Sequence, residues 1–199
     1  MTSFNPLPVH SLTGDVGLFR NVDTLHAQVK LDSPAVLVMT DLRRAHAVTI
    51  DPDKPIDVAL HKMKAAGVRL LFVTSDENSI VGVVTSTDIQ GDLPVRLQRE
   101  RTLRREDIVV RDIMTVTSRL ELLSISDVLE AKVGDIIETL HKAGRRHALV
   151  FDQETESPRN AIRGIFSATQ ISQQLGLLID APPVARTFAE VELALNRSA

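Results

Sequence analysis

The sequence contains no cysteine, no tryptophan and no tyrosine, and its aromatic residues are six phenylalanines. The absence of cysteine excludes disulfides, thiol catalysis and cysteine-based metal sites. The scarcity of aromatic faces argues against the base-stacking platforms of single-strand-binding proteins. The apolar core must therefore be built mainly from leucine, valine, isoleucine and alanine.

Strong charge and long apolar runs are lacking as well. The net charge of -3 over 199 residues argues against general nucleic-acid binding. No apolar run approaches the ~18 residues that cross a bilayer, and residues 1–20 lack the basic start and apolar block of a signal peptide. With 43% hydrophobic and 25% charged residues, the composition is that of a soluble globular protein. We therefore expect a cytoplasmic protein without a membrane partner.

Residues 80–89 and 162–171 share one pattern, an apolar strand that runs into a hydroxyl-rich turn. The β-branched residues suit a half-buried strand. In the first copy the turn is Thr85-Ser86-Thr87-Asp88, whose side-chain oxygens can satisfy free N–H groups at a helix N-terminus. A strand, a turn and a helix that occur twice in one short chain indicate a duplication.

The rest of the repeat follows in order in both copies. Each copy has a Met-Thr pair, a short strand (47–50 and 122–125), an amphipathic helix and a second strand (69–73 and 146–151). The helices carry apolar residues at the spacing of one buried face, over 56–63 and 133–140, and each ends in Ala-Gly. The register is kept except for loop insertions, which is typical of internal repeats.

Three segments lie outside the repeats, which we place at 34–95 and 108–178. Residues 1–33 are interpreted as an arm with a short helix that includes Val29, and 179–199 as a helix with a capping box at Thr187 and Glu190. The connector 96–107 is rich in arginine, with Leu97 and the preceding Val95 expected to touch the core. It is either a solvated helix or an edge that attracts anions, and its acids dilute the second interpretation.

These motifs resemble the CBS domain, named after cystathionine β-synthase, in its usual tandem pair. The matching features are the Met-Thr starts, the two helices, the Ala-Gly ends and the Gly-x-x-Thr-x-x-Asp motif at Gly82, Thr85 and Asp88. The resemblance covers roughly residues 34–178. It implies an α/β (α+β) fold of two β-α-β-β-α repeats packed sheet to sheet in a pseudo-twofold pair. It also implies a standalone, non-catalytic regulatory module that forms a homodimer.

The resemblance further implies a ligand in the cleft between the repeats, AMP, ADP, ATP or S-adenosylmethionine, with no tightly bound cofactor. A carboxylate at Asp88 can accept hydrogen bonds from both ribose hydroxyls. Thr85 or Thr87, with Ser86 between them, can bind phosphate at the helix start. Alternatively, these side chains only cap the helix.

Further contacts are expected from the segments before and within the strands. Arg69, Arg146 and His147 are expected to reach phosphates, although Arg145 and Arg146 could equally be ordinary surface residues. The base is expected against Ala47, Val48 and Ile50. The second copy has Gln170, Ser167 and Ala168 where the first has Asp88, Thr85 and Ser86. We therefore expect one ligand per chain, centred on the first motif.

Other functions have less support from the sequence. The six histidines are scattered without metal-ligand spacing, and no Ser-His-Asp grouping or glycine-rich phosphate loop is present, so we expect no metal site and no enzyme. A ligand-free scaffold for dimerisation and protein–protein interaction is the alternative function. Nucleic-acid contact through the arginines of the connector is a weaker one. The regulated partner protein is not identified by the sequence.

Overall fold

The computed structural model describes residues 29–75, 79–153 and 160–176. Most of the predicted N-terminal arm and the whole predicted C-terminal helix lie outside these residues. The first half contains η1 (Ala35–Val38), β1 (Thr40–Asp41), β2 (Thr49–Ile50), α1 (Ile56–Ala66), β3 (Leu70–Thr74), β4 (Ile80–Thr85), α2 (Ser86–Gln90) and α3 (Asp92–Arg101). The second contains η2 (Arg105–Asp107), α4 (Val110–Ile113), β5 (Thr115–Val116), η3 (Thr117–Arg119), β6 (Leu122–Ser124), α5 (Ile125–Glu130), α6 (Val133–Lys142), β7 (His147–Gln153), β8 (Asn160–Ser167) and α7 (Ala168–Leu175).

The predicted β-α-β-β-α order is confirmed in both repeats, with α5 as an added helix in the second. Helices α1 and α6 bury the predicted apolar face, and their buried residues are Ile56, Ala59, Met63, Val133, Ile136 and Leu140. Both are followed by a glycine in the left-handed conformation, with φ of 66° at Gly67 and 63° at Gly144. Glycine adopts this conformation without a steric penalty, so both helices stop there.

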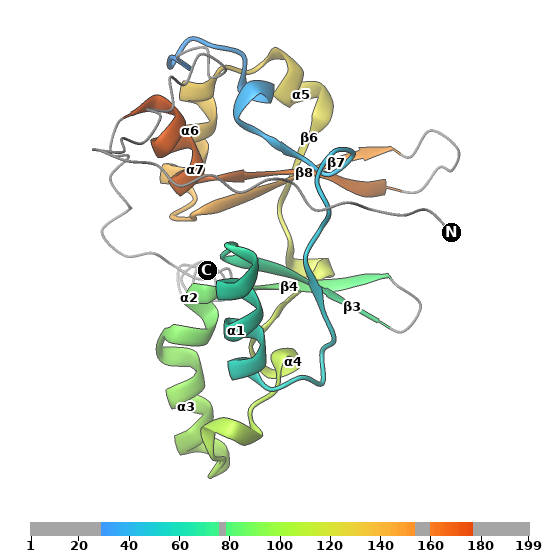
Figure 1. Ribbon diagram of the computed structural model, residues 1–199, viewed down its shortest axis with the longest axis vertical. Coiled ribbons are helices and arrows are strands. Elements are labelled where there is room, and N and C mark those ends of the chain that lie inside the picture. The colour runs from blue at the N-terminus through green and yellow to red at the C-terminus, as the bar shows by residue number, and fades with distance from the viewer. Residues whose placement is uncertain (1–28, 76–78, 154–159, 177–199) are drawn as a thin grey trace, which may run out of the picture.

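The strands form two four-stranded sheets, with the orders β1-β8-β7-β6 and β2-β3-β4-β5. Each sheet takes one edge strand from the start of the other repeat. Strand β1 precedes the first repeat's helix but pairs with β8, and β5 pairs with β4. This exchange ties the repeats together. The two sheets face each other, and helices cover their outer faces (Figure 1).

The exchanged segments pass very close to two glycines at equivalent positions in β4 and β8. A Cβ added at Gly82 would overlap the backbone carbonyl of Thr115, and one added at Gly164 would overlap the side chain of Met39. The close approach of the exchanged segments therefore favours glycine at both positions.

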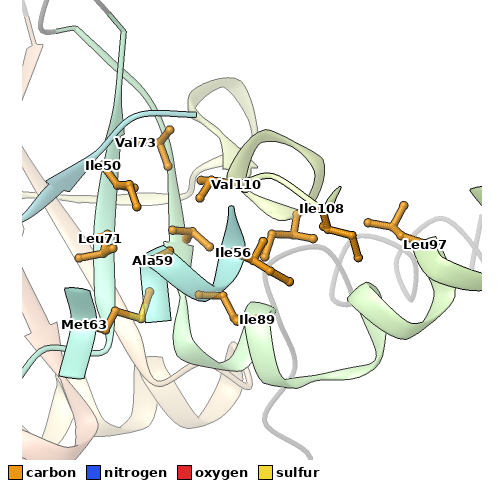
Figure 2. Packing of buried hydrophobic residues seen from close by; sticks show 12 residues of the cluster. Ile50, Ile56, Ala59, Met63, Leu71, Val73, Ile89, Leu97, Ile108 and Val110 are labelled. Carbon is orange, nitrogen blue, oxygen red and sulfur yellow. The ribbon is translucent and has the colours of Figure 1, made fainter. Parts of the chain in front are cut away.

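Three clusters of buried side chains form the core. In the first repeat, α1, α2 and α3 pack on the outer face of their sheet through Ile56, Ile89 and Leu97 (Figure 2). A second cluster, around Phe166, joins the helices of the second repeat to the outer face of their sheet. The third lies between the two sheets and contains Leu70, Phe72, Val83 and Leu149. The repeats thus share one apolar interface, which fixes their relative arrangement.

The arginine-rich connector is mostly paired with acids. Arg101 binds Asp112 at 3.2 Å, Arg104 binds Asp107 at 3.0 Å and Arg105 binds Asp57 at 3.0 Å. These contacts support a solvated connector over an anion-attracting edge. Leu97 is buried as predicted, but the prediction for Val95 was wrong: it is 43% exposed, because helix α3 turns only one of the two faces toward the core.

Within the described ranges, no helix has the length and apolarity to span a bilayer. The same ranges contain no group of three or more His, Cys, Asp or Glu side chains that could hold a metal ion.

Candidate functional site

A cavity of about 500 Å³ lies between the two repeats. From the first half it is lined by Thr40, Leu42, His46, Ala47, Val48, Gly67, Val68, Arg69, Leu70 and Phe72. From the second half it is lined by His147, Ile165, Ser167, Thr169, Gln170 and Gln173. Because both repeats contribute to its walls, a bound molecule would contact both at once.

One wall of the cavity is apolar. Ala47 and Val48 lead into β2, which pairs in parallel with β3 so that Thr49 lies opposite Phe72. Phe72 and Ile165 belong to facing sheets of the shared core and complete this wall. Strand pairing therefore builds a surface suited to a flat apolar ring from segments distant in sequence.

The polar part of the cavity lining belongs largely to the second repeat. His147 begins β7 and pairs with Ser167 at the end of β8, so the two strands present them at the same sheet edge. Helix α7 starts at the next residue and adds Thr169 and Gln170. Hydroxyl and amide groups thus gather at the start of one helix.

Gln170 is held by a residue from the other repeat. The hydroxyl of Thr40 donates a hydrogen bond to Oε1 of Gln170 over 2.9 Å. Thr40 reaches this place because β1 pairs with β8, where it lies opposite Ile165. The first repeat's Met-Thr pair thereby contributes directly to the second repeat's motif.

His147 is a buried histidine next to two arginines. The residue is 9% exposed. Burial, followed by the positive charges of Arg69 and Arg146, lowers the pKa of His147 to about 4. The imidazole is therefore neutral at pH 7 and can either donate or accept a hydrogen bond in the cavity.

The first motif has a different environment. Asp88 is 1% exposed, and its Oδ2 accepts hydrogen bonds from the backbone N–H of Thr85 at 2.7 Å and from its hydroxyl at 2.6 Å. The N–H of Asp88 donates in turn to the hydroxyl of Thr85 at 3.3 Å. This reciprocal arrangement is a capping box at the start of α2. The capping role considered from sequence is thus present in the fold.

The structure divides the predicted site residues into two groups. Those that line the cavity are Ala47, Val48, Arg69 and His147, and those outside its lining are Thr85, Ser86, Thr87, Asp88, Ile50 and Arg146. Ile50 is buried in the first repeat's core, and Arg146 lies near enough to His147 to affect its pKa. Arg145 is not an ordinary surface residue, because only 8% of it is exposed. A role in binding for the second group stays a prediction.

Sequence reasoning missed several cavity residues, notably Thr40, His46 and Thr169. The departure of the second copy from the motif was visible, but it was interpreted as the loss of a site. Thr40 could have been found only from the strand exchange, which no local pattern reveals.

A comparison with protein-family models matches residues 38–93 to the CBS domain. The segment contains β1 to α2, with the Ala47, Val48 and Arg69 side of the cavity. This segment is a CBS domain. The second repeat has the same order of elements and joins it through exchanged strands, so the two repeats are arranged as a tandem pair. No curated protein matches the chain significantly.

Several solved structures align with this chain. An uncharacterized conserved protein from Pyrococcus horikoshii aligns with a TM-score of 0.51 and 22% identity, over 73% of this chain and 93% of its own. A CBS-domain protein from Agrobacterium tumefaciens aligns with a TM-score of 0.49 and 19% identity, over 67% and 88%. CBSX2, solved in complex with AMP, gives a TM-score of 0.46 and 22% identity, over 71% and 94%. The alignment with the Pyrococcus horikoshii protein supports the fold described above.

Proposed function

We propose that the CBS pair is a non-catalytic regulatory module that binds an adenine nucleotide or adenosyl compound and signals to a protein partner. The observation that carries this proposal is the cavity between the repeats, whose lining combines apolar side chains with polar and basic ones. Its volume of about 500 Å³ lies within the range of small-molecule sites. An adenosine derivative has the same division into an apolar ring and a polar tail.

The fit follows from the chemistry of the two ends. An adenine ring would lie against Ala47, Val48 and Phe72, where burial of a flat ring is favourable. The ribose and its substituent would then extend toward Arg69 and Thr169. Arginine offers several N–H donors in a planar arrangement, which suits phosphate oxygens.

The regulatory part of the proposal rests on the shared cavity. A ligand can shift a conformational equilibrium only by its difference in affinity for the two states. Because the cavity walls come from both repeats, their relative position changes the ligand contacts. A partner that senses this position would be coupled to the ligand, and the coupling would be reciprocal.

Calorimetry on the full chain with AMP, ADP, ATP and S-adenosylmethionine tests the proposal. We expect at least one of these to bind, and Arg69→Ala to weaken that binding, since Arg69 lines the cavity. Arg99→Ala in α3 removes the same charge away from the cavity and serves as the matched control. Absence of binding by all four compounds would reject the ligand-sensing function. Equal binding by Arg69→Ala and the control would reject this site.

A ligand-free scaffold is the second candidate, and one surface feature favours it. Leu37 and Leu129 are 57% and 62% exposed, and their elements η1 and α5 pack against each other. Exposed apolar side chains on neighbouring elements are a feature of protein interfaces. Light scattering of the double variant Leu37→Glu/Leu129→Glu tests this surface. A homodimer that persists in the variant would exclude it as the dimer interface.

A further inference from the structure

The two repeats present opposite hydrogen-bonding groups at equivalent positions. Thr85 pairs with Leu70, and Ser167 pairs with His147, so the residues three positions later, Asp88 and Gln170, correspond to each other. A carboxylate only accepts hydrogen bonds, whereas an amide has one acceptor oxygen and a donor NH₂ group. The cavity borders the amide.

Thr40 determines which part of that amide is available to a ligand. Its hydroxyl donates to Oε1 of Gln170 at 2.9 Å, which engages the amide oxygen from the side of β1. The NH₂ group of Gln170 is then the part left to meet a ligand, as a donor. A ligand acceptor placed there can take a hydrogen bond from this group.

The charges around the cavity favour the same kind of ligand group. In the described part of the chain, the ionisable side chains that line the cavity are Arg69, His46 and His147, and no Asp or Glu is among them. Arg146 adds a second positive charge close to His147. The nearby carboxylate of Asp41 forms an ion pair with Arg163. A negative group in this cavity would therefore find positive charge that no lining carboxylate offsets.

We propose that the cavity selects phosphate-bearing adenine nucleotides over neutral adenosine and cationic S-adenosylmethionine, and that Gln170, held by Thr40, donates a hydrogen bond to a ligand oxygen. This inference rests on the proposed function and narrows its ligand class. Gln170 is thus a specificity residue that donates a hydrogen bond to the ligand, whereas an acid at this position would accept hydrogen bonds from ribose hydroxyls. Arg69 and Arg146 supply the attraction for the phosphate.

Ligand selectivity is the first test, by calorimetry on the full chain with AMP, adenosine and S-adenosylmethionine. Hydrogen bonds to a charged group are strong enough that we expect AMP to bind roughly tenfold or more tightly than the other two. The AMP affinity should also fall with added salt. If none of the three binds, and neither ADP nor ATP binds either, the proposed function itself fails. If adenosine and S-adenosylmethionine bind as tightly as AMP, the proposed function stands and this inference fails.

Two variants of matched shape test Gln170. Gln170→Glu keeps the size of the side chain but removes the donor group, so we expect AMP binding to weaken by at least about tenfold. Gln173→Glu places the same charge on the same helix, also on the cavity, and should weaken AMP binding less. Thermal melting of both variants checks that they fold. Stronger AMP or adenosine binding by Gln170→Glu would overturn the inference, because it would show that the ligand presents hydroxyl donors there. Equal losses in the two variants would overturn the specific role of Gln170.

Discussion

The guanidinium Nη1 of Arg145 lies 2.7 Å from Oε2 of Glu121, with the arginine side chain 9% and the glutamate side chain 70% exposed. By strand register, Glu121 corresponds to Val48. Val48 directly precedes Thr49, which pairs with Phe72, and Glu121 directly precedes Leu122, which pairs with Leu149. Arg145 corresponds to Val68. Val68 lies two residues before Leu70, and Arg145 lies two residues before His147, which begins the equivalent strand. Val48 and Val68 both line the cavity. An ion pair therefore replaces two apolar cavity walls in the other half of the pair.

This asymmetry predicts one nucleotide per chain, bound beside Gln170. Replacing Arg145 with the smaller residue of its counterpart, Arg145→Val, should create space beside the first motif. We expect calorimetry to show one binding event in the wild type and an additional, weaker one in the variant. Two equal events in the wild type would contradict this prediction.

His147 should make the stability depend on pH. Its pKa is about 4 in the folded chain and 6.5 as its ordinary value, so between these pH values the unfolded chain binds the proton and the folded chain does not. The contribution of His147 to the free energy of unfolding is fully present above about pH 6.5. It is lost as the pH falls toward 4, by about 3 kcal/mol in total.

Urea unfolding at a series of pH values measures this loss. His147→Leu introduces the residue found at the equivalent position, Leu70, and should flatten the dependence between pH 6.5 and 4. An unchanged slope in His147→Leu would show that other groups cause it.

Asp88 caps α2 and is also predicted from the sequence to bind a ligand, and one substitution can separate the two. Asp88→Asn weakens the capping box with Thr85, and we expect a loss of about 1 kcal/mol in the free energy of unfolding. If the ligand lies beside Gln170, AMP affinity should change by less than about threefold. Calorimetry and urea unfolding of the same preparation give both quantities. A complete loss of AMP binding by a folded Asp88→Asn variant would place the ligand at the first motif instead.

The two equivalent strand glycines should differ in their tolerance of a methyl group. The Cβ of Gly82→Ala would meet the backbone of Thr115, which cannot move without breaking the pairing of β4 with β5. In Gly164→Ala the obstacle is the side chain of Met39, which is flexible and can move. We expect Gly82→Ala to destabilise by about 3 kcal/mol and Gly164→Ala by about 1 kcal/mol, measured by urea unfolding. A larger loss in Gly164→Ala would contradict the strand-exchange explanation.

Local patterns predicted most of the fold. The helices that begin at Ile56 and Val133 have apolar residues at the spacing of a single buried face, and glycines end them, so each could be predicted without knowledge of its neighbours. The duplication was visible for the same reason, because each repeat carries its own complete set of local signals. The exposure of Val95 was not predictable in this way, because it depends on which face of α3 meets the core.

The candidate site was predicted only in part. Ala47, Val48, Arg69 and His147 line the cavity, and they lie in or beside strands that were recognised from sequence. The cavity itself borders the second motif. From the sequence pattern, this motif was the less favoured of the two as a ligand site. Hydrogen-bonding capacity can be assigned to a residue from its type, but access to a ligand depends on what surrounds it.

The sequence by itself determined two repeats, their helices and strands, and the hydroxyl-rich turns at equivalent places, because these depend on contacts within a few residues. The tertiary structure decided which residues surround the described cavity. Strand exchange places Thr40 against Gln170, 130 residues away, while the burial of Arg145 beside Glu121 changes the corresponding region of the other half. Both arrangements depend on the packing of two sheets, and packing between distant segments leaves no periodic signal in the chain.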